Sequence, residues 1–465
     1  MFTSSRSADN FSKIKPLQLN KFFYSDFFPL LIGILAIISY SFNLTLIGFW
    51  AVIIFAIIIF LTSEDVTPIL PLLIMVLTFF RTFDIFLEFD ILIPCALVLI
   101  AIILHFILFP IKKIESGKLF LPLIIVTIAL FLGGVFSHYL YTYKMGVVSR
   151  IATGPVMIIV YFFFTAYLNP PKNFDMKRYI SVCLVVVGFV CTAHLAIYND
   201  LMAIKDPSVS AHTIGWNNAN GIASLLLLCI PACFYLILND KSVVLYTFSL
   251  IILYIGLSIS NSDGCFAIGI VCFPILCLFT YIKANKTMRP KLIYTLLVVI
   301  LLLVVGLTIW LTQASIYTIL EDIKKQFVSD SGRTELYIEA INHFIKYPIF
   351  GIGFGYTPEE TKMFTSVIIA YNYHSTFFHV IATMGIVGLL AYIYYFVKRY
   401  KILLNNDSAF NTFSYISFSA MEVYGFIDCC EFNIMPLLII ATLLLIVVEK
   451  NNLKKEQALP LTATL

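Results

Sequence analysis

The chain is a series of apolar segments, each long enough to cross a lipid bilayer and separated by short polar connections. Its 465 residues are 60% hydrophobic and 12% charged, with a mean hydropathy of +0.96. Soluble domains carry about 25% charged residues. A bilayer-spanning helix needs roughly 17–25 mostly apolar residues. The pattern therefore predicts an all-α fold, a polytopic membrane helical bundle.

Applied along the chain, the length rule predicts about 14 transmembrane helices. The third is short because it ends at Arg81. The predicted helices cover residues 28–43, 46–62, 67–80, 91–109, 119–136, 147–169, 178–197, 220–238, 242–259, 263–282, 291–313, 375–397, 410–427 and 432–448.

These helices divide the chain into five expected regions. A cytoplasmic tail (1–26) has no pattern of a cleavable signal and precedes a transmembrane bundle of about 11 spans (27–313). A long polar segment (314–374) follows, then the last three helices (375–448) and a second cytoplasmic tail (449–465).

The basic residues predict the orientation. Most of the 30 lysines and arginines fall on alternate connections between the predicted helices. Such residues are enriched on the cytoplasmic side. We therefore expect a multi-pass protein of the cytoplasmic (inner) membrane, with both tails inside and the 314–374 segment facing outward.

Charge and cysteine content exclude several classes of site. The net charge of +4 is small and scattered, without the basic patch that nucleic-acid binding needs. Most of the ten cysteines lie inside apolar segments, where they behave as small apolar side chains. Cys429 and Cys430 are adjacent, which is not the spacing of a zinc pair. We expect no metal and no nucleic-acid partner.

The outward segment has a helical pattern of its own. Apolar residues recur at helical spacing from Ile316 to Phe327, which predicts an amphipathic helix. A turn at 329–332 interrupts the pattern. A second helix is expected from Thr334 until Pro348 ends it.

A glycine-rich stretch and a histidine close the outward segment. Gly351, Gly353 and Gly355 look like a fragment of a dinucleotide-binding fingerprint, but no strand precedes them. They are better explained as a tight turn. His374 and Ser375 then stand at the start of an apolar helix, which fixes a titratable group at the membrane boundary.

Together these elements resemble the signature loop of the O-antigen ligase and polymerase superfamily. The ligase pattern is His, then Asn, Ser or Gln, then nine residues, then Gly-x-x-Gly. His374, Ser375, Gly385 and Gly388 match it completely. Arg333 before a helix, and the glycine-rich turn, add to the resemblance. The rest of the chain agrees only in its layout of membrane spans.

The resemblance implies a metal-independent glycosyltransferase without cofactors. It would join a glycan carried on undecaprenyl diphosphate to a hydroxyl of a glycan or lipid-glycan acceptor, in surface polysaccharide assembly with other assembly proteins. His374 would be the base. Arg333 would neutralise the leaving diphosphate, because its planar fork pairs with phosphate oxygens. Attack opposite the diphosphate would invert the anomeric carbon.

One element departs from the family pattern. Members often carry a second arginine in a Ser-Arg-Gly-like element at the outer end of an earlier span, where this chain has Asp263. Arg81, Lys144 and Arg150 lie at predicted outer ends of spans and could supply the missing charge. Arg150 is the best candidate, because a cation inside an apolar helix is costly without a partner. Asp263 could pair with one of them or contact sugar hydroxyls.

Several candidates also have a simpler structural interpretation. His374 could cap its helix, and Arg333 could be a solvated loop charge. Arg150 could snorkel to the interface, and Asp263 could be a helix N-cap. His379, about 140° round the helix from His374, is expected to pack inside the bundle.

Three further residues are candidates for substrate binding. Ser375 adjoins His374, and the Trp216 indole with the neighbouring Asn217 amide could stack on and hydrogen-bond a sugar. An interfacial tryptophan with a capping asparagine is the simpler explanation of that pair. The acidic groups near the outer face have no assigned role beyond possible sugar contacts; they are Glu422, Asp428 and Glu431.

The sequence leaves three functions open. A ligase and a polymerase would share the same donor site and differ in the acceptor. A small-anion, bicarbonate-like transporter carries a similar loop, but the chain shows no internal repeat and no pair of interrupted helices in matching positions. The third is a non-catalytic scaffold in a glycan-assembly complex, a minor alternative that the missing second arginine leaves open.

Overall fold

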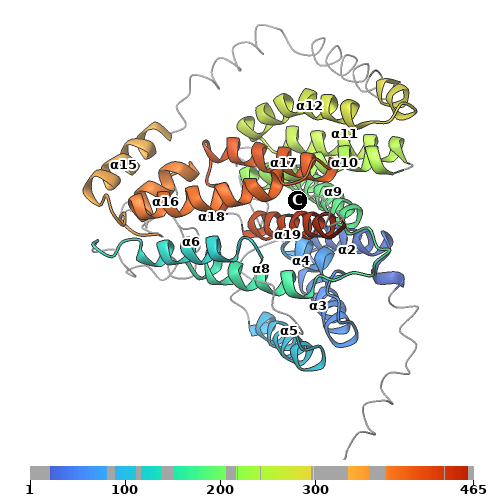
Figure 1. Ribbon diagram of the computed structural model, residues 1–465, viewed down its shortest axis with the longest axis horizontal. Helices are drawn as coiled ribbons and strands as arrows, with labels where there is room; N and C mark the ends of the chain where they lie inside the picture. Colours follow the sequence, from blue (N-terminus) through green and yellow to red (C-terminus); the bar gives the residue numbers. More distant parts are fainter. Residues whose placement is uncertain are drawn as a thin grey trace, which may run out of the picture.

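The structure is a bundle of helices (Figure 1). The computed structural model describes residues 21–80, 89–111, 117–137, 150–205, 216, 218–240, 242–294, 297, 333–354, 373–433 and 435–458. No strand occurs in these ranges. Six of the described helices are long and apolar enough to cross a membrane, and shorter apolar helices accompany them. The protein is therefore an all-α, multi-pass membrane protein, as predicted.

The described helices agree closely with the predicted spans. In the first half they are α2 (Phe27–Ser41), α3 (Thr45–Thr62), α4 (Ile69–Met75) with the 3-10 turn η2 (Val76–Phe79), α5 (Phe89–Leu108), α6 (Phe120–Leu132), α8 (Pro155–Tyr167) and α9 (Met176–Lys205). In the second half they are α10 (Ala219–Asn239), α11 (Val243–Ile259), α12 (Asp263–Lys283), α15 (Arg333–Lys346), α16 (Thr376–Leu404), α17 (Ala409–Gly425), α18 (Cys430–Asn433) and α19 (Met435–Ala458).

Two predicted helices fall mostly or wholly on residues that the structure does not describe. Most of the predicted span 291–313, and the whole amphipathic helix predicted from Ile316 to Phe327, lie outside the described residues. The helix expected from Thr334 to Pro348 is present as α15.

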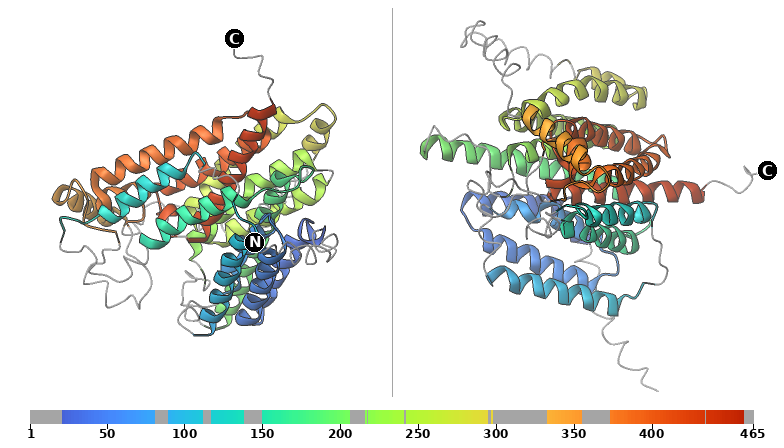
Figure 2. Two further views of the ribbon diagram at one scale, coloured as in Figure 1. Left: turned by 60° about the horizontal axis from the view of Figure 1, so that its bottom comes forward. Right: turned by 90° about the vertical axis from the view of Figure 1, so that its left-hand side faces the viewer.

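The core of the bundle forms around α9 and α10. Of the apolar window of α10, 94% is buried, whereas the corresponding value for α12 is 22%. Because α10 packs against α9, α11, α12 and α17, its apolar residues face protein on all sides. By contrast, α3 and α5 form a pair at the edge of the bundle (Figure 2).

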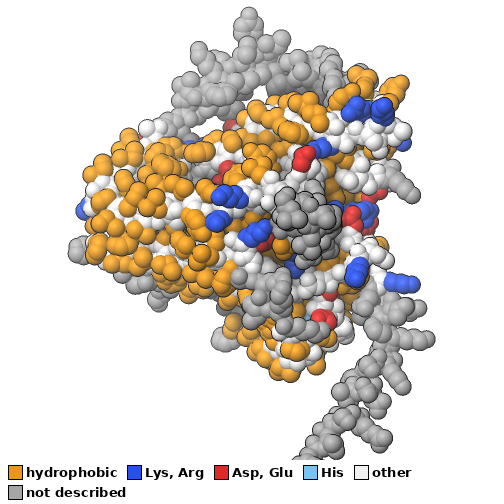
Figure 3. Space-filling model, viewed as in Figure 1, with side chains coloured by type: hydrophobic (Ala, Val, Ile, Leu, Met, Phe, Trp, Pro, Cys, Tyr) orange, Lys and Arg blue, Asp and Glu red, His pale blue; other side chains and the backbone are white. Residues whose placement is uncertain are grey.

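The apolar surface is what a lipid-facing protein requires. Figure 3 shows a broad hydrophobic face over α15 and α16. On α16 it includes Ile386, Leu390, Ile393 and Val397, each at least 40% exposed. These residues recur at helical spacing, so they form one stripe along the helix.

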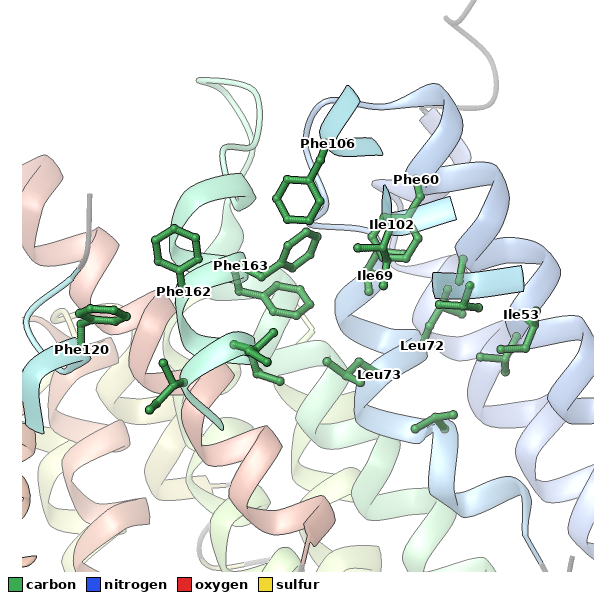
Figure 4. A pocket seen from close by; sticks show the side chains of 18 residues that line it. Ile53, Phe60, Ile69, Leu72, Leu73, Ile102, Phe106, Phe120, Phe162 and Phe163 are labelled. Carbon is green, nitrogen blue, oxygen red and sulfur yellow. The ribbon is translucent and has the colours of Figure 1, made fainter. Parts of the chain in front are cut away.

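A cavity of about 550 Å³ lies between the α3–α5 pair and α8 (Figure 4). Its lining consists of hydrocarbon side chains, including Ile53, Phe60, Phe106 and Phe163. None of them can transfer a proton or bind a phosphate. The chemistry must therefore be sought elsewhere.

Candidate active site

His374 stands directly before α16 in an unusual backbone conformation. Its φ is +45°, in the left-handed region that few residues other than glycine adopt. The next residue, Ser375, is extended and is the N-cap of α16. Conformations of this kind persist only where the surroundings enforce them, and they gather at functional sites. The His374 side chain is 39% exposed, so a substrate can reach it.

A carboxylate stands beside this imidazole. Nδ1 of His374 lies 3.3 Å from Oδ1 of Asp428, whose side chain is only 7% exposed. Oδ1 also accepts the Cys429 N–H at 2.7 Å, and the Tyr424 hydroxyl lies 3.5 Å from Oδ2. The sequence did not reveal that Asp428 pairs with His374, since nothing in its local pattern distinguishes it from the other acidic groups near the outer face.

The surroundings keep Asp428 charged. Burial by itself would raise the pKa of this carboxyl. The interaction with His374, the Cys429 N–H and the positive charge of Arg333 together outweigh burial and hold the pKa below its ordinary value of 3.8. An ionised carboxylate can hold the imidazole in one tautomer, with the proton on Nδ1.

Arg333 lies on the same side of the bundle as His374. It is the first residue of α15, one turn before Tyr337 and on the same helix face. The Tyr337 ring stacks on Phe378 at 4.5 Å, and its hydroxyl donates to the His374 carbonyl at 3.1 Å. Because the Arg333 charge also acts on Asp428, the two predicted catalytic residues share one electrostatic environment.

The helix that follows His374 is broken at Gly385. There φ is +61° and ψ is −153°, so α16 is two helical segments joined at this glycine. The segment after the break, 386–404, is 19 residues long, which corresponds to about 28 Å of rise. That length matches the hydrocarbon core of a bilayer. Residues 376–384 form a shorter segment between the break and the site.

The glycine-rich turn, residues 348–353, packs against this break and hydrogen-bonds to its backbone. The carbonyls of Ala382 and Thr383 accept the N–H groups of Ile352 and Gly353, at 2.8 and 3.1 Å. Beyond the break, the N–H groups of Ile386 and Val387 donate to the Pro348 and Ile349 carbonyls, at 2.9 and 3.2 Å. Irregular backbone at membrane depth needs such partners.

This junction explains Gly385 of the motif and Gly351 of the turn. A Cβ on Gly385 would lie 2.5 Å from the Ile349 carbonyl, and one on Gly351 would lie 2.4 Å from the Thr383 carbonyl carbon. Both residues also have positive φ. The pattern that resembles the ligase signature thus has the site at one end and this packed junction at the other.

Arg150 lies beside the same junction. Its side chain is 1% exposed, and Nη2 donates to the Gly133 carbonyl at 3.1 Å. The next residue, Gly134, donates its N–H to the Phe350 carbonyl at 2.8 Å. Arg150 is therefore buried against backbone rather than snorkelling to the interface.

The element that replaces the second family arginine adjoins the His374–Asp428 pair. Ser262, not Asp263, is the N-cap of α12, so the N-cap interpretation of Asp263 is wrong by one residue. The Ser262 hydroxyl lies 3.2 Å from the Tyr424 hydroxyl, which reaches Asp428. Asp263 itself is exposed at the helix N-terminus, where a negative charge is favourable.

Trp216 is not an exposed platform for a sugar. It is 1% exposed, and its Nε1 donates to Nδ1 of His194 at 3.2 Å. His194 in turn stacks on Tyr40 at 4.0 Å. The expectation that this indole contacts a sugar is corrected for that reason: its ring is enclosed by the bundle.

The remaining candidates divide into buried and undescribed residues. Ser375 is 1% exposed, and its hydroxyl has no hydrogen-bond partner within the described ranges. His379 is fully buried, with the rings of Phe354 and Phe432 each 5.1 Å away, which fits its expected packing role. Arg81, Lys144 and Asn217 lie outside the described residues.

The described side chains offer no group of three or more His, Cys, Asp or Glu residues that could hold a metal ion. The described side chains that meet at the site supply an imidazole, a carboxylate and a guanidinium. Such a set can remove a proton from a hydroxyl and neutralise an anionic leaving group.

Comparison with known proteins agrees with the motif. No curated protein matches the chain. Residues 248–393 match the O-antigen ligase family. This range includes α12, α15, Arg333, His374 and the break at Gly385, whereas Asp428 lies beyond it. This match covers about a third of the chain and supports its resemblance to the O-antigen ligase and polymerase superfamily.

Proposed function

We propose that this protein is a membrane glycosyltransferase that transfers or polymerises a glycan from an undecaprenyl-diphosphate-linked donor onto an acceptor hydroxyl. The observation that carries the proposal is the position of His374, which lies 3.3 Å from Asp428 with Arg333 on the same side of the bundle. A base and a cation facing one space suit a reaction in which a proton and a diphosphate leave together.

The reaction follows from these positions. Nδ1 of His374 faces Asp428, which leaves Nε2 to accept the proton of the acceptor hydroxyl. The acceptor oxygen then bonds to the anomeric carbon, while the bond from that carbon to the diphosphate oxygen breaks and its electron pair leaves with the diphosphate. Arg333 offsets the charge that develops there. Attack from the opposite side inverts the anomeric configuration.

Other residues are proposed to bind the substrate around this centre. Asp263 is exposed close to the pair and would accept hydrogen bonds from sugar hydroxyls. The buried Ser375 hydroxyl would donate to a group bound at the start of α16. Arg150, which already holds a backbone carbonyl, would add positive charge beneath the site rather than bind the diphosphate directly.

The experiment compares surface glycan in cells that produce single variants. His374→Ala and Arg333→Ala are each expected to abolish surface glycan or its elongation, with normal insertion into the membrane. His105→Phe removes a histidine away from the site, and Lys346→Ala removes a positive charge from the far end of α15, so both serve as controls. Unchanged glycan in a well-inserted His374→Ala strain would refute the proposed base.

The transporter alternative gains one structural observation, the broken helix α16. Interrupted helices bind substrates in many transporters through their freed backbone groups. Here the groups at the break that are described above are bonded to the turn at 348–353, so they are not open to an ion. Flux of bicarbonate into vesicles that contain the protein and no lipid-linked glycan would favour transport instead.

A further inference from the structure

A buried cluster of charges lies in the helices that carry the site. Arg399 of α16 is 1% exposed. Its two terminal nitrogens face Glu422 of α17 and Glu431 of α18, whose side chains are 19% and 4% exposed. Arg399 follows the predicted span 375–397, and its guanidinium points into the bundle.

Aromatic rings complete the surroundings of this guanidinium. The rings of Tyr395, Phe396 and Phe418 lie 5.0, 4.6 and 5.2 Å from its central carbon. A cation in an apolar bundle is costly unless it is paired, so its position is strongly determined. The cluster therefore fixes α16, α17 and α18 relative to one another.

The cluster also bears on the site, because of where Glu431 lies. Glu431 is three residues after Asp428 in the connection that runs from Phe426 to Asn433. Phe432, the next residue, packs 5.1 Å from His379 and 5.0 Å from Tyr392. This connection, which we call the Asp428 connection, is held at His374 by one acidic residue and at Arg399 by another.

We propose that Arg399 and Glu431 are positioning residues that hold the Asp428 connection so that Asp428 meets His374. Arginine suits the task because its rigid fork can face two carboxylates at once, which the single ammonium of lysine cannot reproduce. Without the guanidinium, Glu422 and Glu431 repel each other and the connection moves. The catalytic consequence rests on the proposed function, whereas the structural one does not.

Two buried thiols report on the position of the connection. Cys429 and Cys430 are 0% and 1% exposed. The full-length protein in proteoliposomes would be treated with N-ethylmaleimide, and modification of each cysteine followed by peptide mass spectrometry. Arg399→Lys and the isosteric Glu431→Gln are expected to speed labelling of Cys429 by about tenfold or more. The buried Cys191 controls for global unfolding.

Kinetics then separate positioning from general loss of structure. Glu431→Gln is expected to lower kcat for glycan transfer about tenfold at unchanged KM for the donor, since the connection aids proton removal and not donor binding. Combined with Asp428→Asn it should cost no more than Asp428→Asn alone, because both act through one contact.

The outcomes distinguish the two levels of the proposal. Labelling of Cys429 that stays at the wild-type rate in both variants overturns the positioning role, whatever the activity. Effects of Glu431→Gln and Asp428→Asn that multiply also overturn it. Faster labelling together with no transfer by the wild-type protein would support the structural role and contradict the proposed function alone.

Discussion

The polar groups at the two ends of the bundle differ in how completely the protein itself satisfies them. Arg150, just before α8, lies beside the Gly385 junction, and the Tyr167 carbonyl at the end of α8 accepts the Val66 N–H next to Asp65. Asp65 accepts hydrogen bonds from the Tyr24 hydroxyl, from the Thr67 N–H and hydroxyl at 3.1 and 2.8 Å, and from the Asn169 N–H at 2.8 Å. This carboxylate is fully occupied by the protein.

At the other end the backbone is strained, and the imidazole that stands there is partly exposed. His374 has a positive φ and a side chain that is 39% exposed, and its carboxylate partner lies at 3.3 Å. The Ser375 hydroxyl has no partner in the described part of the chain. The difference suggests that the Asp65 end was selected to join helices and the His374 end to meet a ligand, at some cost in stability.

The largest expected effect is that of Gly385→Ala, which disturbs the backbone of the break in α16. A Cβ there would overlap the Ile349 carbonyl, and alanine is disfavoured at a φ of +61°. The strained backbone alone costs about 1–3 kcal/mol. We expect loss of both thermal stability in detergent and glycan transfer. Wild-type stability and transfer in Gly385→Ala would contradict the packing assigned to this glycine.

Next in size is the effect of Asp65→Asn on stability. The variant cannot satisfy all the donors that Asp65 accepts, which costs about 1–3 kcal/mol. A lower midpoint of thermal unfolding is expected, with unchanged transfer per folded molecule. Reduced turnover at unchanged stability would show that the two ends are not specialised in this way.

Asp428→Asn should reduce turnover about tenfold with little loss of stability, which is the reverse of the effect expected for Asp65→Asn. Since folding lowers the pKa of Asp428 below 3.8, the carboxylate stabilises the native state above that pH, and this contribution is lost as the pH falls through the lowered value. Stability measured from pH 6 to pH 3 should therefore fall less in the variant. Identical pH profiles would contradict the assigned interaction.

The smallest effect is expected for Tyr424→Phe. Its hydroxyl lies 3.2 Å from the Ser262 hydroxyl and 3.5 Å from Asp428, so both contacts are weak. Turnover should change by about twofold or less. A loss as large as that of Asp428→Asn would mean that Tyr424, and with it the start of α12, has a direct part in the site.

The sequence was sufficient to predict the described helices and to point to His374 and Arg333 as neighbours. Apolar segments reveal spans because a bilayer imposes their length, and α15 followed from helical periodicity. His374 and Arg333 belong to one continuous motif, so their common location could be expected from the resemblance.

What the sequence did not reveal depends on contacts between distant segments. Asp428 becomes distinctive only when the α17–α18 connection meets His374, and Arg399 only when two carboxylates face it. The burial of Trp216 was missed because a tryptophan near the end of a predicted span is typical of the membrane interface. Gly385 was recognised as part of a motif, but its purpose required the glycine-rich turn that packs against it.

The most direct test of the account is single-turnover transfer by the purified protein in proteoliposomes, with an undecaprenyl-diphosphate-linked glycan as the donor. His374→Ala is expected to bind the donor as the wild type does and to transfer it at least about a hundredfold more slowly. Transfer at the wild-type rate by a folded His374→Ala protein would contradict the assignment of the base, and with it the proposed mechanism.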